Sequence, residues 1–154
     1  MNLGRDLITN GKFTTDLTGW TADTDWVQDS NAAVNLVAAT PAASELGQDF
    51  NSVIGKRYEL RYDILAGTDL SGTFSISATS AFAALELEIT VGIDKVYVIT
   101  TVDAASAQDL TFLVGDDNSE NELIYLDNIE LREILEDGIY ENGIYRDNLF
   151  STTF

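Results

Sequence analysis

Apolar side chains recur at every second position through much of this chain, and this rhythm constrains its fold more than any other sequence feature. Residues 57–65 show it best, because one set of alternate positions is apolar and the other is charged: Tyr58, Leu60, Tyr62 and Ile64 against Arg57, Glu59, Arg61 and Asp63. Successive side chains of a β-strand point to opposite sides of a sheet, so such a run predicts a half-buried strand.

Further segments predict strands through the same alternation or through β-branched and aromatic residues, and turn residues separate them. These segments are 34–38, 73–78, 85–91, 96–102, 110–114 and 123–131. In 85–91, the side chains of Leu85, Leu87, Ile89 and Val91 should share one apolar face. Strands at this spacing predict an all-β fold, a two-sheet antiparallel β-sandwich or barrel of about eight or nine strands.

The length of 154 residues fits one domain, and no linker or change of composition interrupts residues 1–135. We therefore expect one domain over 1–135 and a C-terminal extension over 136–154.

The chain contains neither cysteine nor histidine. The missing cysteine excludes disulfides and iron–sulfur clusters, and the missing histidine removes the usual general base and nearly all zinc sites. A glycosidase would need only two suitably spaced carboxylates, but some pairs among 26 acidic residues meet by chance. We therefore expect no enzymatic activity.

The net charge of −18 decides which partners are excluded. Nucleic-acid binding needs clustered Lys and Arg, whereas here eight basic residues face 26 acidic ones without a basic patch. Anionic membranes are disfavoured for the same reason. We therefore expect neither nucleic acid nor membrane as a partner.

The first residues do not read as a targeting segment, because Asn2, Gly4, Arg5 and Asp6 interrupt the region where an apolar signal core would lie. No apolar run approaches the ~20 residues of a membrane helix. If the chain is complete, we expect that the usual signal-peptide route does not export it.

Asp127 is the one polar residue in an otherwise apolar set of alternate positions: Leu123, Tyr125, Asp127, Ile129 and Leu131. A carboxylate on an apolar face must be hydrogen-bonded or bound to a cation, since burying it alone would cost several kcal/mol. Either Asp127 ties the last strand to an N-terminal loop through backbone N–H groups, or it is a calcium ligand.

Three stretches of the sequence resemble galactose-binding-like carbohydrate-binding modules. They are LITNGKF followed by LTGWT within 7–21, GKRYEL at 55–60 and IYLDNIEL at 124–131. They occur in the family's order and span about residues 6–131. The resemblance implies a β-sandwich of the jelly-roll type, with Trp20 in the core beneath the first sheet.

The same resemblance implies a structural calcium ion near the joined chain ends, with Asn10 and Asp127 in the matching regions; no other cofactor is expected. The position after Phe13, often acidic in the family, is Thr14 here. Binding modules hold sugar rings on exposed aromatic side chains. Trp26 and Phe82 are the candidates for such a platform, and the alternative for each is packing in the core or at its rim.

The C-terminal extension contains the strongest hairpin signal in the sequence. Asn142-Gly143 lies between short apolar segments, and a two-residue turn there would place Tyr140 opposite Tyr145 and Glu141 opposite Ile144. A lone hairpin is marginal in water, so its apolar residues need a surface to cover. The candidate docking residues, on this domain or on a partner, are Ile139, Tyr140, Ile144, Tyr145, Phe150 and Phe154.

Two functions fit these features. The first is a non-enzymatic virion structural protein of a tailed bacteriophage (a capsid decoration, head-fibre or tail-fibre component), with other virion proteins or itself as partners, a trimer included, and with surface glycans as ligands. The alternative is an extracellular polysaccharide-binding module that acts beside a secreted glycoside hydrolase. Because the chain contains neither a catalytic domain nor a signal peptide, we expect the virion.

Overall fold

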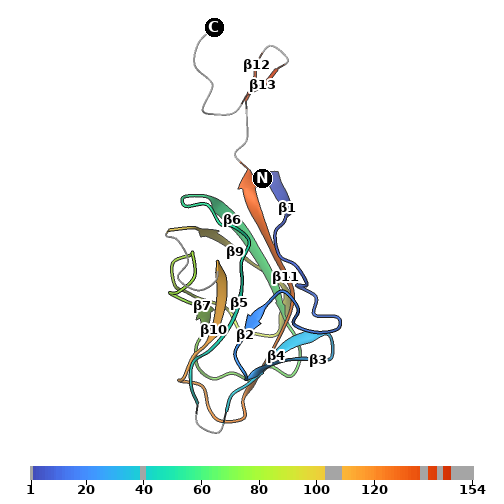
Figure 1. The fold of residues 1–154 in the computed structure, drawn as a ribbon, viewed down its shortest axis with the longest axis vertical. Helices are drawn as coiled ribbons and strands as arrows, with labels where there is room; N and C mark the ends of the chain where they lie inside the picture. Colours follow the sequence, from blue (N-terminus) through green and yellow to red (C-terminus); the bar gives the residue numbers. More distant parts are fainter. Residues whose placement is uncertain (1, 39–40, 103–108, 136–138, 142–143, 147–154) are drawn as a thin grey trace.

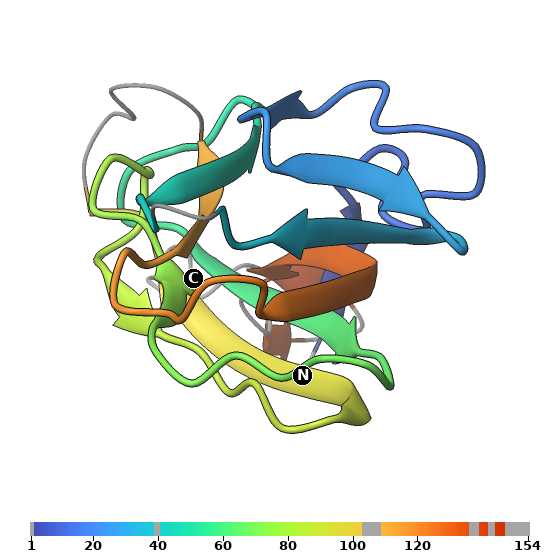
Figure 2. The same cartoon turned by 90° about the horizontal axis from the view of Figure 1, so that it is seen from below.

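The computed structural model describes residues 2–38, 41–102 and 109–135, and the backbone of 139–141 and 144–146. Its main part is a sandwich of two sheets (Figures 1 and 2). Sheet A contains β1 (Asn2–Asp6), β3 (Trp26–Asp29), β4 (Ala32–Leu36), β6 (Arg57–Ile64), β9 (Gly92–Thr100) and β11 (Leu123–Leu135). Sheet B contains β2 (Thr21–Ala22), β5 (Ser44–Gln48), β7 (Phe74–Ile76), β8 (Leu85–Glu86) and β10 (Leu110–Val114).

The strand order is that of an antiparallel jelly-roll sandwich. Sheet A has the order β3-β4-β11-β6-β9, with β1 beside the second half of β11, and sheet B has the order β2-β5-β10-β7-β8. Every strand pair of the described residues is antiparallel. The predicted all-β, two-sheet fold is confirmed, and none of the described residues forms a helix that could span a membrane.

The core lies between the two sheets and is rich in aromatic rings. The four apolar residues of β6 are at most 2% exposed, as the alternation predicts: Tyr58, Leu60, Tyr62 and Ile64. Phe74 and Phe112 of sheet B stack with ring centroids 5.7 Å apart, and the Tyr62 ring of sheet A packs edge-on against both. Trp20 is also in the core, as predicted. Such rings supply much of the apolar area that holds two sheets together.

The opening segment is tied to the middle of β11. The carboxylate of Asp6 accepts hydrogen bonds from the backbone N–H groups of Ile8 and Leu131, both 3.1 Å long. The N–H of Ile129 donates to the carbonyl of Gly11 at 2.9 Å. The predicted tie between the chain ends therefore exists, but Asp6 provides its carboxylate instead of Asp127.

The prediction that Asp127 interrupts an apolar face is wrong, because β11 changes face near its middle. Ile124 and Leu126 are fully buried before that point, and Ile129 and Leu131 after it. Between the two pairs, Asn128 has a φ of 48° and the register with β6 shifts. This irregularity adds one residue to the strand, so odd and even positions exchange faces. Asp127 consequently lies on the outer face, opposite Asp63 of β6.

The predicted strand 85–91 is also largely wrong, since β8 contains only Leu85 and Glu86. Beyond it the chain leaves sheet B and crosses to β9 of sheet A. Leu87 is buried, but Val91 is 55% exposed. The crossing is held by tyrosine hydroxyls, because Tyr62 donates to the carbonyl of Glu88 and Tyr97 accepts from its N–H. Apolar residues of a crossing segment can alternate without pairing in a sheet.

The C-terminal extension contains β12 (Ile139–Glu141) and β13 (Ile144–Arg146), which pair with each other. Tyr140 lies opposite Tyr145 and Glu141 opposite Ile144, which confirms the predicted hairpin register. The side chains predicted to dock lie outside the part of the chain described in full: Ile139, Tyr140, Ile144, Tyr145, Phe150 and Phe154.

Candidate functional site

A polar hollow of about 440 Å³ opens on the outer face of sheet A. Its walls come from β1, the loop after it, β6, β9 and β11. The lining residues are Leu3, Lys12, Arg61, Asp63, Ile93, Asp94, Asn128, Glu130 and Arg132. Three of the chain's eight basic residues thus meet three carboxylates in a molecule of net charge −18.

A second hollow of about 320 Å³ adjoins the first and shares Lys12, Asn128 and Glu130 with it. It extends over the opening loop, where Asp6, Asn10 and Thr14 add polar groups. We call the two hollows together the polar groove. Its outward-facing positions on the strands follow directly from the alternation that buries the apolar residues.

Asp63 forms the floor of the groove. Its side chain is 7% exposed, and both carboxylate oxygens accept hydrogen bonds. Oδ1 accepts from the N–H of Asp94 at 2.7 Å, and Oδ2 accepts from the side-chain amide of Asn128 at 2.6 Å. Asp63 therefore joins the start of β9 to the irregularity of β11 at Asn128, and these two hydrogen bonds fix the shape of the groove.

The two guanidinium groups of the groove are held by neighbouring carboxylates. Arg61 pairs with Glu59 at 2.6 Å and more distantly with Asp94 at 3.5 Å, while Arg132 pairs with Glu130 at 3.0 Å. Lys12 is exposed, and no ion pair of Lys12 occurs within the described part of the chain. The groove therefore offers guanidinium donors held by ion pairs and one ammonium donor outside these pairs, beside several acceptors.

Asp127 lies beside this groove and differs from the other carboxylates in lacking a full set of partners. Its Oδ1 is buried without a hydrogen-bond partner in the structure. Burial raises the pKa of Asp127; the N–H of Asn128 opposes this rise, Asp63 adds to it and Lys12 opposes it. Because a buried oxygen without a donor is costly, a bound cation would stabilise this position.

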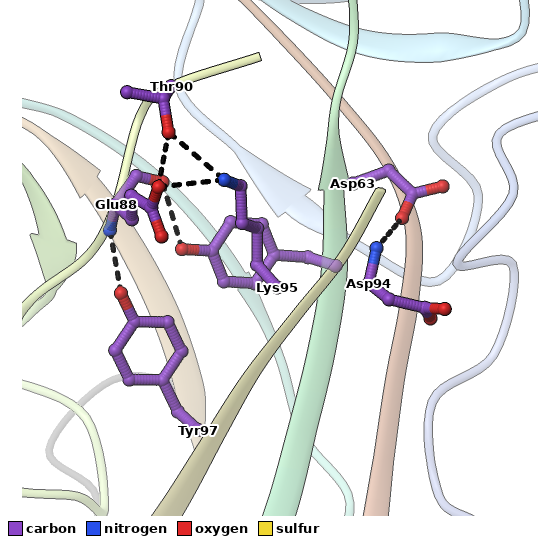
Figure 3. Close-up of polar contacts among 7 residues, drawn as sticks. Asp63, Glu88, Thr90, Asp94, Lys95 and Tyr97 are labelled. Carbon is purple, nitrogen blue, oxygen red and sulfur yellow. Dashed lines mark hydrogen bonds and ion pairs between the residues drawn. The ribbon is translucent and has the colours of Figure 1, made fainter. Parts of the chain in front are cut away.

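β9 sends its polar side chains to two different places, as Figure 3 shows. Asp94 lies at the groove beside Asp63, whereas Lys95 points toward the crossing segment. The Lys95 ammonium contacts Glu88 at 2.9 Å and Thr90 at 3.0 Å. Lys95 therefore fixes the crossing segment and does not line the groove.

Neither predicted sugar platform is exposed, so this prediction is corrected. Trp26 is 4% exposed and Phe82 is 2% exposed. Trp26 is at an inward position of β3, opposite buried Asn35. Phe82 packs with Phe50 and Tyr58 in an aromatic cluster. Both rings serve the core, which was the alternative for each.

The two residues implied as calcium ligands lie in neighbouring parts of the fold. Asn10 lines the polar groove, and its side-chain N–H₂ donates to the carbonyls of Asp16 and Thr18. Asp127 is next to Asn128, which also lines the groove. In the described part of the chain, no three acidic side chains are grouped as metal ligands. A cation at Asp127 would therefore need backbone carbonyl oxygens as well.

Apart from Asn10, the residues that line the groove were not predicted as a site from the sequence. The signal was present in part, because Arg61 and Asp63 were assigned to the charged face of the strand 57–65. What was missing was the change of face in β11, which brings Asn128, Glu130 and Arg132 to the same surface.

Comparisons with known proteins find similarity at the level of the fold and not of the sequence. No protein-family model and no curated protein sequence matches this chain. Among solved structures, the α-L-arabinofuranosidase MgGH51 with bound arabinose gives a TM-score of 0.59 at 12% identity, covering 96% of this chain and 29% of the enzyme. A family 16 carbohydrate-binding module gives 0.53 at 20% identity, covering 81% of this chain and 98% of the module.

The enzymatically active domain of tailspike protein 4 from bacteriophage CBA120 gives a TM-score of 0.51 at 17% identity. The match covers 84% of this chain and 21% of the chain of that domain. The chain therefore spans less than a third of the two enzymes, but nearly the whole length of the binding module.

Proposed function

We propose that this protein is a non-catalytic glycan-binding jelly roll whose ligand lies in the polar groove. The observation that carries the proposal is the groove itself, because guanidinium, ammonium, amide and carboxylate groups converge there on one open surface. Sugar hydroxyls both donate and accept hydrogen bonds, so a mixed set of fixed donors and acceptors suits them. The fold shared with a family 16 carbohydrate-binding module supports this use.

The apolar part of a sugar ring would find Leu3 and Ile93 at the edge of the groove. Ile93 is 75% exposed, which is unusual for a side chain of this size. Aliphatic side chains also offer apolar surface to sugar C–H groups, without the directional preference of an aromatic ring. This explains how a binding groove could operate without Trp26 or Phe82.

Calorimetric titration with a panel of soluble polysaccharides tests the proposal. Lys12→Ala should weaken binding about 10- to 100-fold, since a hydrogen bond to a charged group contributes roughly 1.5–3 kcal/mol. Arg57→Ala is the matched control, because it removes one positive charge from sheet A outside both hollows. A wild type that binds none of the polysaccharides would overturn the proposal. If Lys12→Ala and Arg57→Ala weakened binding equally, the ligand would not lie in the polar groove.

For the biological setting, we propose a structural component of a tailed-bacteriophage virion, on the capsid or the tail. The fold shared with the phage tailspike supports this setting. Mass spectrometry of purified virions should detect the chain, and its absence from the particle would refute the setting. The likeness to an arabinofuranosidase favours the second candidate, an extracellular module beside a glycoside hydrolase. That candidate predicts co-purification with such an enzyme.

We also propose that a structural calcium ion binds at Asp127, together with the opening loop around Asn10. The buried, unpartnered Oδ1 of Asp127 and its raised pKa support a cation there. A chelator should lower the melting temperature of the wild type and leave that of Asp127→Asn unchanged, since a ligand of the native state stabilises it by mass action. A wild type insensitive to the chelator would exclude the ion.

A further inference from the structure

β9 carries an apolar surface of which only Ile93 also lines the groove. Half of the exposed large apolar side chains in the described part of the chain lie on β9 or its two flanks: Val91, Ile93, Val96, Val98 and Val102. β9 is also the edge strand of sheet A. Within the described residues, its backbone from Gly92 to Ile99 pairs only with β6, whereas Thr101 and Val102 beyond its end pair with residues 81–82. An exposed apolar edge strand is a ready template for pairing with another strand, because one row of its N–H and C=O groups has no partner strand.

An apolar hollow of about 210 Å³ runs beside this edge. One wall is formed by residues 82–85, and the other by Val98, Ile99, Thr100 and Val102. No charged side chain lines it. A strand added to β9 would form main-chain hydrogen bonds with the edge and place alternate side chains in the hollow. The two features together form an acceptor for an extended apolar segment.

The C-terminal extension of this protein has the composition of such a segment. It begins after Leu135, and its 19 residues include seven large apolar side chains: Ile139, Tyr140, Ile144, Tyr145, Leu149, Phe150 and Phe154. β9 and β11 are both antiparallel to β6, so they end at the same end of sheet A. The extension therefore leaves the sandwich about two strand spacings, or roughly 10 Å, from the edge of β9.

We propose that the β9 edge of one copy of this protein binds the C-terminal extension (residues 139–154) of a second copy. A strand added outside β9 would lie three strand spacings, or roughly 14 Å, from β11. The three residues between Leu135 and Ile139 can span only about this distance when fully extended, which favours the edge of a neighbouring copy. Each copy then carries one donor segment and one acceptor edge. Such an interface is heterologous and generates closed rings or open chains of copies.

The net charge of −18 opposes this association at low ionic strength. Because the hollow itself is uncharged, salt should weaken the repulsion between copies without weakening the contact. Association should therefore increase between about 0.02 M and about 0.5 M salt. A contact made of ion pairs would show the opposite dependence.

The test is the mass of the full-length protein in solution, measured by light scattering over a range of concentrations. Val98→Lys should abolish association, because it places a charge in the hollow. Val27→Lys is the matched control, since Val27 is 50% exposed on β3 at the opposite edge of the same sheet, and Val98 is 46% exposed. The double variant Phe150→Asp/Phe154→Asp should also abolish association.

Mixing the two defective proteins separates the alternatives. The Val98→Lys protein keeps its donor segment and the double variant keeps its acceptor edge, so a mixture should form one-to-one dimers that grow no further. If two β9 edges paired with each other, the double variant would still associate. If the extension docked on its own sandwich, each variant would have a lower melting temperature than the wild type but the same mass in solution. Either result would overturn the proposal, as would a wild type that is monomeric at every concentration and salt.

Discussion

Gly11 shows at the scale of one residue how closely the opening loop approaches the backbone of β11. A Cβ atom at this position would lie 2.0 Å from the carbonyl oxygen of Ile129, which is backbone and cannot move aside. The carbonyl of Gly11 also accepts the N–H of Ile129. Only glycine allows both the approach and the hydrogen bond.

Gly11→Ala should therefore destabilise the protein by at least about 1–3 kcal/mol, the usual cost of overpacking. Gly4→Ala is the control, because its Cβ would be 3.5 Å from the nearest atom, an ordinary contact. Urea unfolding of both variants measures the difference. A Gly11→Ala protein as stable as Gly4→Ala would show that the ends can separate at little cost.

Asp109 is a second residue whose role is local. Its Oδ2 accepts the N–H groups of Phe50 and Ser52, at 2.9 and 3.0 Å, and its Oδ1 accepts the hydroxyl of Ser52. Burial by itself would raise the pKa of Asp109, but these hydrogen bonds outweigh burial and hold the pKa below its ordinary value. The charged form is thus the one that stabilises the loop before β6.

Asp109→Asn should cost about 1–3 kcal/mol at neutral pH. A depressed folded-state pKa gives stability that is present above the unfolded value of 3.8 and is lost as the pH falls through the lower folded value. The difference between wild type and variant should therefore shrink below about pH 4. Asp116→Asn is the control, since Asp116 is exposed. A difference that is independent of pH would argue against a charged Asp109.

At the scale of elements, the irregularity of β11 at Asn128 decides which side chains face the groove. Asn128 adopts a φ of 48° there, and its side-chain amide donates to Asp63 at 2.6 Å. Asparagine tolerates this left-handed conformation better than most residues other than glycine. One residue thus reverses the faces of a strand and joins it to the neighbouring strand.

The contributions of backbone and side chain can be separated by two variants. Asn128→Gly keeps the backbone conformation and should lose about 1–2 kcal/mol with the amide hydrogen bond. Asn128→Val loses the same bond and places a β-branched residue at positive φ, so it should lose roughly 1–3 kcal/mol more. Denaturant midpoints compare them. If both variants lose the same free energy of unfolding, the left-handed conformation of residue 128 does not contribute to the stability of the irregularity.

At the scale of the whole molecule, the net charge of −18 dominates the electrostatics. The ion pairs found among the described residues mostly involve partly exposed side chains and contribute little each. Repulsion among the many carboxylates therefore outweighs the attraction within these pairs. Raising the ionic strength from about 0.01 M to about 0.15 M should raise the melting temperature by a few degrees. Choline chloride should raise the melting temperature as much as sodium chloride does, because screening depends on ionic strength and not on the kind of cation. An unchanged or lower melting temperature would show that the repulsion between carboxylates is small.

The sequence by itself determined the elements whose structure depends on near neighbours. The burial of Tyr58, Leu60 and Tyr62 follows from alternation along one strand, and the Asn-Gly pair in the sequence was enough to predict the register of β12 and β13. Period-two patterning and turn chemistry are local properties, and they are readable without knowledge of the partner strands. Together with the resemblance to binding modules, they were enough to predict a two-sheet jelly roll.

Only the tertiary structure decided where the functional surface lies. The irregularity at left-handed Asn128 put Asp127 and Ile129 on opposite faces of β11, and packing against residues distant in sequence buried Trp26 and Phe82. The groove joins Lys12, Arg61 and Arg132 from three separate elements. Such a site depends on which strands become neighbours, because burial and approach are set by contacts between elements and not by the pattern within any one of them.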